Sequence, residues 1–452
     1  MGRRRLSRYA ALVACLMTVT AAFGGVQSAR AAQPNILVIV TDDQRQGTMH
    51  VMPNTRHFLF DDGRYFPRGF VTTPNCCPSR ASIFTGLFAH NHGIKRNSTS
   101  ALPQNVTVQR YLHDAGYKTA ILGKYLNSWP LAQAPPFFDR WALVRPDSYV
   151  NAEFNIDGSV GPVPGYSTDV IESRTIQFLR AFNRQDDKPW FLYVAPVAPH
   201  RPATPAPQYA AAPVPPWVPS AAMLEADRSD KPPWVRRNAV PPAVMQTERD
   251  KMLRTLMSVD DMVGNVFHEL AALKERRDTL AIFISDNGYA WGEHGIRGKW
   301  RPYTESIRVP LAMRWPGHLE PGSVDTGIAT NVDLAPTILA AARITPAAPM
   351  DGVSLLQPGT RQRLFTEFWG NPAKGRPDWA QIRTRRVTYI EYYGADRSNP
   401  IFREYYRIDR DGWQLRNLLY DGDSTNNPDL SHWKDLIRLY ANCAGSACPG
   451  PS

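Results

Sequence analysis

Four short apolar runs, widely spaced along the chain, constrain its fold more than any other feature of the sequence. They cover residues 35–40, 119–122, 190–194 and 279–284. Each is rich in Ile, Val, Leu or aromatic residues without polar alternation, which is the pattern of a strand covered on both faces. Helical patterns lie between them, most clearly over residues 247–273. This alternation predicts an α/β fold with a large, mostly parallel sheet flanked by helices.

Polar side chains follow each of the four runs. Because parallel strands present their carboxyl ends at one edge of a sheet, side chains that follow them can share one site. A single such position is compatible with an ordinary turn, but four together indicate a functional centre. The side chains in question are Asp42, Asp43, Lys124, His200, Asp286 and Asn287.

The two ends of the chain differ from this central part. Residues 1–31 combine a basic start, an apolar run and a small-residue cleavage site, as in a secretory signal peptide. The run is too short to favour a stable membrane span of about 20 residues, so we expect a secreted, periplasmic or cell-surface protein. Beyond residue 357, short strand patterns and a final helical stretch predict a small antiparallel subdomain.

The net charge gives little support to a nucleic-acid partner. The formal charge of the whole chain is +11, but residues 1–31 contain five arginines and no acid. The remainder is mildly basic and has no long run of Lys and Arg, which argues against nucleic-acid binding.

Two of the five cysteines are adjacent, Cys76 and Cys77, in the stretch PNCCPSR. Neighbours in sequence rarely bridge each other, whereas Cys443 and Cys448 are well spaced for a short disulfide loop in an exported protein. Pro78 fits the first turn of a helix, so Cys76 is expected at a helix N-terminus, where backbone N–H groups favour an anion.

Residues 76–86, CCPSRASIFTG, resemble the signature Cys-x-Pro-Ser-Arg-x-x-x-x-Thr-Gly of the type I sulfatases, which belong to the alkaline-phosphatase-like superfamily. In that family the first cysteine is oxidised to formylglycine, whose hydrated aldehyde is the nucleophile. The spacing assigns this role to Cys76, not to Cys77. The resemblance therefore implies a formylglycine-generating enzyme as a partner during maturation.

The resemblance extends over residues 33–420 and implies a divalent metal, calcium or alternatively magnesium. Its implied ligands are an oxygen of the modified Cys76 and the side chains of Asp42, Asp43, Asp286 and Asn287. Carboxylate and amide oxygens suit either ion. The implied domains are a signal peptide at 1–31, a catalytic sulfatase domain at 32–356 and a C-terminal subdomain at 357–452.

The resemblance also implies catalytic roles for five residues. Arg80 orients the hydrate formed at Cys76, and Lys124 contacts both the hydrate and the sulfate. His200 and Lys299 hold the sulfate and protonate the leaving oxygen. The arrangement stabilises charge on the outer oxygens of the transferred group, which is a large contribution in such reactions.

One position departs from the pattern of many sulfatases, which carry a histidine two residues after the lysine. Leu126 stands there, so the base for sulfate release is left open between a water and a histidine elsewhere: His90, His92 or His294. The GKYLN and APHRP segments are closer to the N-acetylglucosamine-6-sulfatase and heparan 6-O-sulfatase branch.

The sequence therefore predicts a hydrolase of sulfate monoesters, acting on sulfated sugars or aryl sulfates. The alternative within the superfamily is a phosphonate or phosphate diester hydrolase. A second alternative is an inactive secreted protein that binds carbohydrate.

Overall fold

The computed structural model describes residues 33–97, 102–184, 188–357, 359, 361–371, 374–394 and 397–449. The predicted signal peptide lies outside the described residues. From Gln33 onward the chain forms one compact unit. At its centre is a ten-stranded sheet with the order β13-β2-β12-β9-β1-β8-β4-β5-β6-β7.

The middle of this sheet is parallel and contains all four predicted strands. They are β1 (Asn35–Thr41), β4 (Lys118–Gly123), β8 (Trp190–Ala195) and β9 (Thr279–Ser285). Neighbouring strands pair in the order β9-β1-β8-β4, with Val38 opposite both Tyr193 and Ile282. A fifth parallel strand, β5 (Arg140–Val144), extends the sheet beyond β4.

The outer strands make the sheet mixed. On one side β12 (Leu311–Arg314) pairs antiparallel with β9 and is followed by β2 (Arg64–Tyr65) and β13 (Ser323–Val324). On the other side β6 (Glu153–Ile156) and β7 (Ser159–Pro162) continue antiparallel from β5. The predicted large, mostly parallel sheet is thus confirmed.

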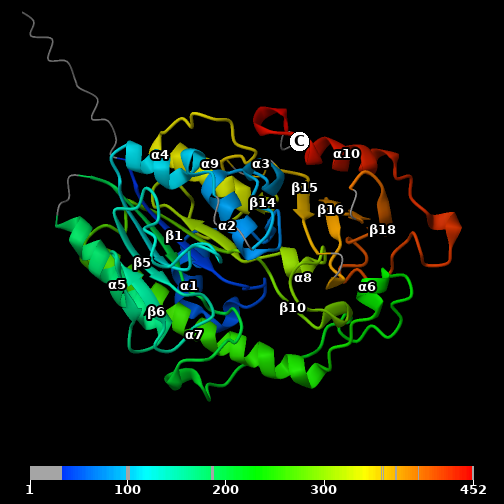
Figure 1. Ribbon diagram of the computed structural model, residues 1–452, viewed down its shortest axis with the longest axis horizontal. Coiled ribbons are helices and arrows are strands. Elements are labelled where there is room, and N and C mark those ends of the chain that lie inside the picture. Colours follow the sequence, from blue (N-terminus) through cyan, green and yellow to red (C-terminus); the bar gives the residue numbers. More distant parts are fainter. Residues whose placement is uncertain are drawn as a thin grey trace, which may run out of the picture. The chain divides into compact units, whose positions relative to one another are not determined.

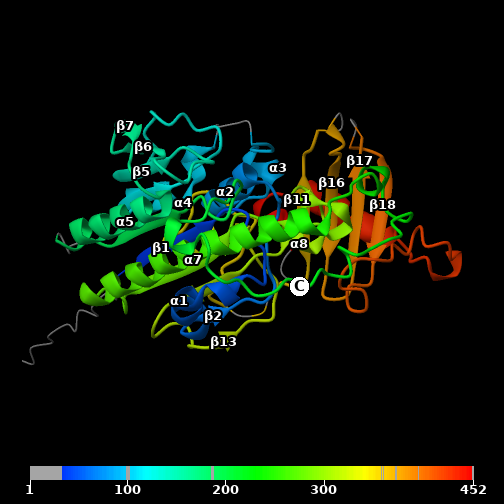
Figure 2. The ribbon, with the colours of Figure 1, turned by 90° about the horizontal axis from the view of Figure 1, so that it is seen from below.

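Helices cover both faces, as Figures 1 and 2 show. Alternate residues of β1 enter two hydrophobic cores, one containing Val38 and the other Leu37. The first core includes side chains from α2 (Cys76–Thr85), α4 (Val108–Asp114) and α9 (Leu334–Ala342). The second includes α5 (Ser167–Asn183) and α7 (Pro242–Ala272), and α7 is the helix expected over residues 247–273.

The C-terminal part forms a second, four-stranded antiparallel sheet, in agreement with the prediction. Its order is β15 (Leu364–Phe368), β16 (Asp378–Arg383), β17 (Thr388–Tyr393) and β18 (Pro400–Tyr406). The strands of this sheet appear in orange in Figure 2. The final helix α10 (Ser431–Ala441) packs on the sheet through a third hydrophobic cluster. The predicted disulfide Cys443–Cys448 is present, with an S–S distance of 2.06 Å.

The remaining elements are short. The α-helices and strands among them are α1 (Pro53–Thr55), β3 (Gly69–Phe70), α3 (Ala89–His92), α6 (Pro233–Arg236), β10 (Ala290–Trp291), β11 (Arg297–Gly298), α8 (Thr304–Ile307) and β14 (Ala329–Thr330). A π-helical turn covers Arg56–Asp61, and short 3₁₀ helices cover Met49–Val51, Gln104–Val106, Pro207–Tyr209, Glu293–Gly295, Asn331–Asp333, Ser424–Asn426 and Gly445–Ala447. Among the helices of the described residues, none has the length and apolar character needed to cross a bilayer.

Candidate active site

The carboxyl ends of the parallel strands bring the predicted site residues together. The Asp286 N–H donates to the Thr41 carbonyl at 3.0 Å, which fixes the end of β9 beside the end of β1. The Lys124 N–H donates to the Ala195 carbonyl at 2.8 Å, which does the same for β4 and β8. Residues far apart in the sequence thus meet because regular strand pairing places their side chains at one edge.

Cys76 begins helix α2 and is fully buried at this edge. Its sulfur accepts a hydrogen bond from the Lys299 Nζ at 2.6 Å, and its S–H points to Asp42 Oδ1 at 3.4 Å. One potential ligand atom from each of Asp42, Asp43, Cys76 and His200 lies within 4.8 Å of the others. The first cysteine of the pair is therefore the one that faces the cluster.

Three buried carboxylates in this cluster are matched by three buried cations. Arg80 Nε donates to Asp286 Oδ2 at 2.8 Å, and Lys124 donates to Asp42. Lys299 donates to Asp43. Burial of isolated charges is very unfavourable, so each of these side chains depends on its partner.

Burial alone would raise the pKa of the Asp42 carboxyl, but Lys124, His200 and Arg80 lower it to about 2. Burial alone would lower the pKa of Lys124, but the carboxylate of Asp42 raises it above its ordinary value. The pKa of Lys299 is likewise raised, by Asp43, despite burial. The lysines therefore remain cationic near neutral pH and can bind an anion.

The same surroundings disfavour the thiolate form of Cys76. Burial, followed by the nearby carboxylates of Asp286 and Asp42, raises its pKa well above the ordinary value, and Lys124 and Lys299 oppose this effect. Since the thiolate is the nucleophilic form of cysteine, a thiol held protonated is a poor nucleophile.

Asn287 gives independent support for a metal at this position. Its Nδ2 donates to Asp43 Oδ1 at 2.7 Å, which orients the amide. Its Oδ1 is buried and receives no hydrogen bond from the described residues. Buried polar atoms without a partner are rare, and an amide oxygen beside carboxylates is a normal ligand for a hard cation. The donor set therefore fits a divalent metal.

His200 lies at the mouth of the cluster and connects it to a residue that the sequence analysis missed. Its Nε2 is 3.8 Å from Asp43 Oδ2, and its Nδ1 is 2.9 Å from Asp147 Oδ1. Burial opposes protonation of the ring, but Asp42, Asp43 and Asp147 raise its pKa above the ordinary value. Asp147 follows β5, so recognising that parallel strand would have added it to the candidates.

A pocket of about 820 Å³ opens beside His200. Its lining includes Arg201 and Lys251, neither of which has an ion-pair partner among the described residues, and Arg297, which Glu248 holds at 2.8 Å. The buried cluster therefore has an adjoining space with a basic lining.

The three other histidines considered as a base have partners elsewhere. His90 bonds to Glu367, His92 to Ser82, and His294 to Glu225 at 2.7 Å. Leu126, which stands where many sulfatases have histidine, is buried in a hydrophobic core. Within the described residues, His200 is the histidine that joins the cluster.

Comparison with known families explains this arrangement. The sequence profile described as Sulfatase matches residues 34–344, which is more than half of the chain. The chain belongs to the sulfatase family. A second profile, described as the C-terminal region of N-sulphoglucosamine sulphohydrolase, matches residues 292–438 of this sulfatase-family chain.

Individual relatives agree with the assignment to the sulfatase family. Human N-acetylglucosamine-6-sulfatase is 31% identical over 93% of this chain and 86% of its own length. An extracellular sulfatase Sulf-1 homologue of Caenorhabditis elegans is 34% identical over 72% of this chain, which spans only 49% of that relative's length.

A solved structure supports the fold. A protein determined in complex with its substrate D-glucosamine-2-N,6-O-disulfate superimposes with a TM-score of 0.75, at 24% identity, over 90% of this chain and 96% of its own. The superposition covers nearly all of both molecules, so the arrangement of the sheet is shared with that protein.

Proposed function

We propose that this chain hydrolyses sulfate monoesters and that its substrates are sulfated sugars. The observation that carries the proposal is the position of Cys76, buried at a helix N-terminus and surrounded by three carboxylates and three cations. The resemblance to N-acetylglucosamine-6-sulfatase and the sulfated glucosamine bound by the structural neighbour support the choice of sugar esters. Phosphonate monoester hydrolases also share the fold, with TM-scores of 0.69 and 0.68. The sulfatase profile and the N-acetylglucosamine-6-sulfatase relatives nevertheless favour sulfate esters over the rival phosphonate or phosphate diester hydrolase and over an inactive carbohydrate-binding protein.

Two groups complete the proposed site. Formylglycine, made from Cys76 by a formylglycine-generating enzyme, supplies an aldehyde hydrate as the nucleophile. A divalent metal, calcium in preference to magnesium, supplies Lewis-acid chemistry toward the sulfate oxygens. Asp42, Asp43, Asp286 and Asn287 would hold this metal together with residue 76, in keeping with their all-oxygen donor set.

The side chains around this centre have distinct proposed roles. Lys124 and Lys299 bind the sulfate oxygens, because both are buried cations that face the cluster. Arg80 holds the floor of the site through Asp286 and the Lys124 carbonyl, at 2.8 and 2.7 Å. His200 is placed to give a proton to the leaving oxygen, since its pKa is raised and it lies at the mouth of the cluster.

Export and domain organisation form part of the same proposal. Residues 1–31 act as a cleaved signal peptide, residues 32–356 carry the chemistry, and residues 357–452 form the C-terminal subdomain. Secretion is consistent with the extracellular relatives and with the disulfide Cys443–Cys448.

The first test combines mass spectrometry with a substitution at Cys76. Peptides that cover this residue in active protein are expected to show the loss of one sulfur and two hydrogens and the addition of one oxygen. Cys76→Ala is expected to abolish hydrolysis of nitrophenyl sulfate while the melting temperature changes little. The matched variant Cys77→Ala, made in the neighbouring thiol, should retain the modification.

Three outcomes would contradict the proposal. An intact thiol at position 76 in fully active protein would remove the nucleophile. Substantial turnover by Cys76→Ala would do the same. Faster hydrolysis of a phenylphosphonate ester than of sulfate esters would favour the rival hydrolase.

A further inference from the structure

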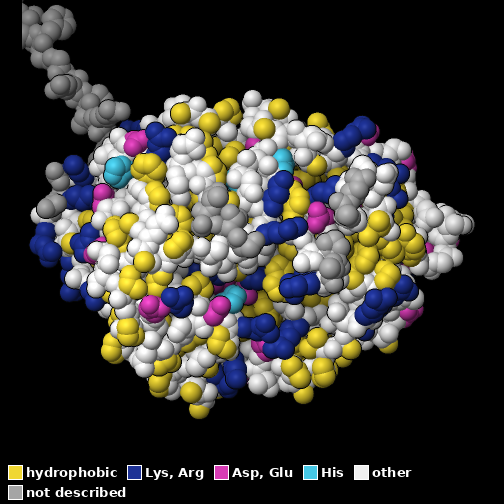
Figure 3. Space-filling model, in the orientation of Figure 1, with side chains coloured by type: hydrophobic (Ala, Val, Ile, Leu, Met, Phe, Trp, Pro, Cys, Tyr) yellow, Lys and Arg dark blue, Asp and Glu magenta, His cyan; other side chains and the backbone are white. Residues whose placement is uncertain are grey.

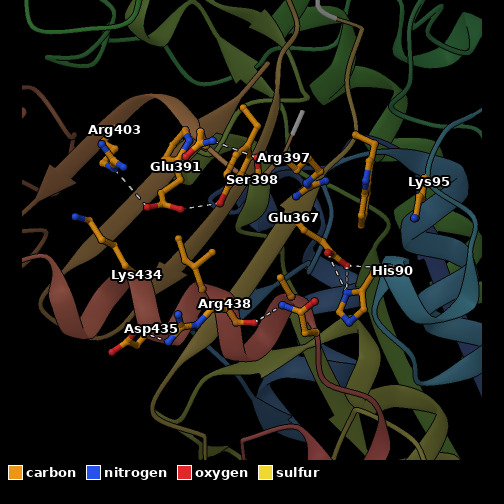
Figure 4. Close-up of a pocket in the computed structure, with 17 residues that line it drawn as sticks. His90, Lys95, Glu367, Glu391, Arg397, Ser398, Arg403, Lys434, Asp435 and Arg438 are labelled. Carbon is orange, nitrogen blue, oxygen red and sulfur yellow. Dashed lines mark hydrogen bonds and ion pairs between the residues drawn. The ribbon is translucent and has the colours of Figure 1, made fainter. Parts of the chain in front are cut away.

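A second pocket, of about 630 Å³, lies between the C-terminal sheet and helix α10. Figure 4 shows it, with Lys95 on one side and Arg403 and Lys434 on the other. It shares no lining residue with the pocket beside His200 or with the cluster around Cys76. The sulfatase chemistry therefore does not account for it.

Positively charged side chains from four parts of the chain converge on this pocket. Lys95 follows α3, Arg397 precedes β18, Arg403 belongs to β18, and Lys434 and Arg438 belong to α10. Such convergence from distant segments is a property of the tertiary structure. On the face shown in Figure 3, several Lys and Arg side chains lie near the middle, with acidic side chains among them.

The acidic side chains of the pocket already have donors. Glu367 accepts from the backbone N–H of His90 at 3.0 Å and from its ring at 2.8 Å. Glu391 accepts from the hydroxyls of Tyr389 and Tyr393, at 2.6 and 2.7 Å. The third carboxylate, Asp435, is paired with Arg438 at 2.8 Å. Glu391 also forms an ion pair with Arg403 at 3.4 Å, so Arg403 and Arg438 are each paired with a carboxylate of the pocket. Among the described residues, the other three cations of the pocket are paired with none of these carboxylates.

The other three cations are Lys434, Lys95 and Arg397. Lys434 is exposed and has no ion-pair partner among the described residues. Lys95 lies over the Trp369 ring, 4.8 Å from its centre, and Arg397 lies 4.6 Å from the centre of the same ring. Arg397 Nη1 forms an ion pair with Asp378 Oδ2 at 3.6 Å, outside the pocket lining, and has no hydrogen-bond acceptor among the described residues. Lys95 and Lys434 are exposed and Arg397 is half-exposed, so these three cations are accessible to an anionic ligand.

We propose that this pocket binds an anionic saccharide segment, through its sulfate or carboxylate groups, at a site separate from the catalytic centre. The volume exceeds what a single inorganic anion needs and suits about two sugar units. The lining also contains the amides of Asn399 and Asn442, which donate to Ser398 Oγ at 3.2 Å and to the Arg438 carbonyl at 2.7 Å. An amide can form up to four hydrogen bonds, so both side chains can also bond to sugar hydroxyls.

This inference depends on the proposed function only for the choice of a sugar. A chain that holds a sulfated polymer at a second site would keep the polymer close while one ester after another is hydrolysed. Such tethering would raise the effective concentration of the polymer's other esters at the catalytic centre, without any change in that centre.

Binding can be tested in full-length Cys76→Ala protein, so that hydrolysis does not interfere. The probe is a sulfated hexasaccharide, measured by isothermal titration calorimetry at low ionic strength. Lys434→Glu is expected to raise the Kd about tenfold, because it removes one charge-assisted contact and adds a repulsive charge. Lys434→Arg should retain binding. The matched control Lys274→Glu makes the same charge change at an exposed residue outside the pocket and should leave the Kd unchanged.

The other ligands distinguish the sources of the anion. A desulfated hexasaccharide that binds equally well would assign the interaction to carboxylates and still support the pocket. Equal effects of Lys434→Glu and Lys274→Glu would overturn the proposal, as would tighter binding of single-stranded DNA of the same charge.

Hydrolysis by the otherwise native chain separates this proposal from the proposed function. Lys434→Glu should leave the hydrolysis of nitrophenyl sulfate unchanged and raise the KM for the sulfated polymer. A chain that binds the hexasaccharide but hydrolyses no ester would refute only the proposed function. A chain that is active, with a polymer KM insensitive to Lys434→Glu, would refute only the second site.

Discussion

At the scale of single residues, the site depends on charges that are fully buried and paired. Arg80 and Asp286 are both 0% exposed, and they join segments 206 residues apart. Removing one member of such a pair leaves the other charge buried without compensation. The resulting loss of folding free energy is much larger than that caused by breaking an exposed ion pair.

Asp286→Ala is therefore expected to lower the free energy of unfolding by about 3–5 kcal/mol, because Arg80 loses its partner. It should also reduce bound metal and the rate of ester hydrolysis. Urea unfolding, metal analysis and sulfatase assays measure the three effects. The matched control is Asp114→Ala, which breaks an exposed pair with Arg110 and should change stability by about 1 kcal/mol or less. Equal stability and metal content in the two variants would contradict the assignment.

His92 predicts a pH dependence of stability. Its Nδ1 accepts the Ile94 N–H at 3.0 Å, so the folded protein requires a neutral ring. Burial, with the nearby His90, lowers its pKa to about 3 from the ordinary 6.5. As the pH falls, the unfolded state binds a proton at His92 before the folded state does. The stability that comes from the neutral His92 ring is therefore complete above pH 6.5 and is lost progressively as the pH falls toward 3.

The slope due to one proton is about 1.4 kcal/mol per pH unit in this window. Urea unfolding between pH 7.5 and 4.5 should show a shallower dependence for His92→Gln than for the native chain. Parallel curves for the two proteins would show that His92 is not the group responsible.

At the scale of secondary structure, the end of strand β4 is fixed by one glycine. Gly123 has a φ of +89°, and a Cβ there would lie 2.0 Å from the Ala195 carbonyl oxygen. That oxygen accepts the N–H of Lys124 at 2.8 Å. The close approach of β4 to β8 thus sets the position of a proposed sulfate-binding lysine.

Gly123→Ala is expected to reduce both stability and activity, since the backbone strain of about 1–3 kcal/mol adds to a steric clash. Gly116→Ala is the matched control, because Gly116 has the same φ of +89° but nothing within 4 Å of the added Cβ. Thermal unfolding and ester hydrolysis should both be affected more at Gly123. The same loss of stability in both variants, with activity intact, would show that the close approach has no role.

At the scale of the whole molecule, the proposed metal links segments that follow different strands. A ligand that binds only the folded state stabilises it, by about 4 kcal/mol at a thousand times its Kd. Chelation is therefore expected to lower the melting temperature and the hydrolysis rate, and added calcium should restore both. Asp286→Ala should show a much smaller response. Full activity and an unchanged melting temperature after verified removal of metal would exclude the metal from the site.

Local sequence patterns predicted the middle of the large sheet well. An uninterrupted run such as NILVIV has both a strand propensity and a burial pattern of its own, so β1 could be recognised without its neighbours. The strand β5 was missed because it is short and begins with Arg140 and Trp141, which are only half-buried. The two-residue strands β2 and β13 carry no local signal at all.

By itself the sequence determined the parallel core, the family resemblance and the choice between two adjacent cysteines, because each is written in a short stretch with fixed spacing. Only the tertiary structure decided which partners the side chains meet. It placed Asp147 beside His200, left Asn287 Oδ1 without a hydrogen-bond donor in the described part of the chain, and gathered five cations from four parts of the chain around a second pocket. Contacts between segments so far apart follow from how strands and helices pack, which no local pattern records.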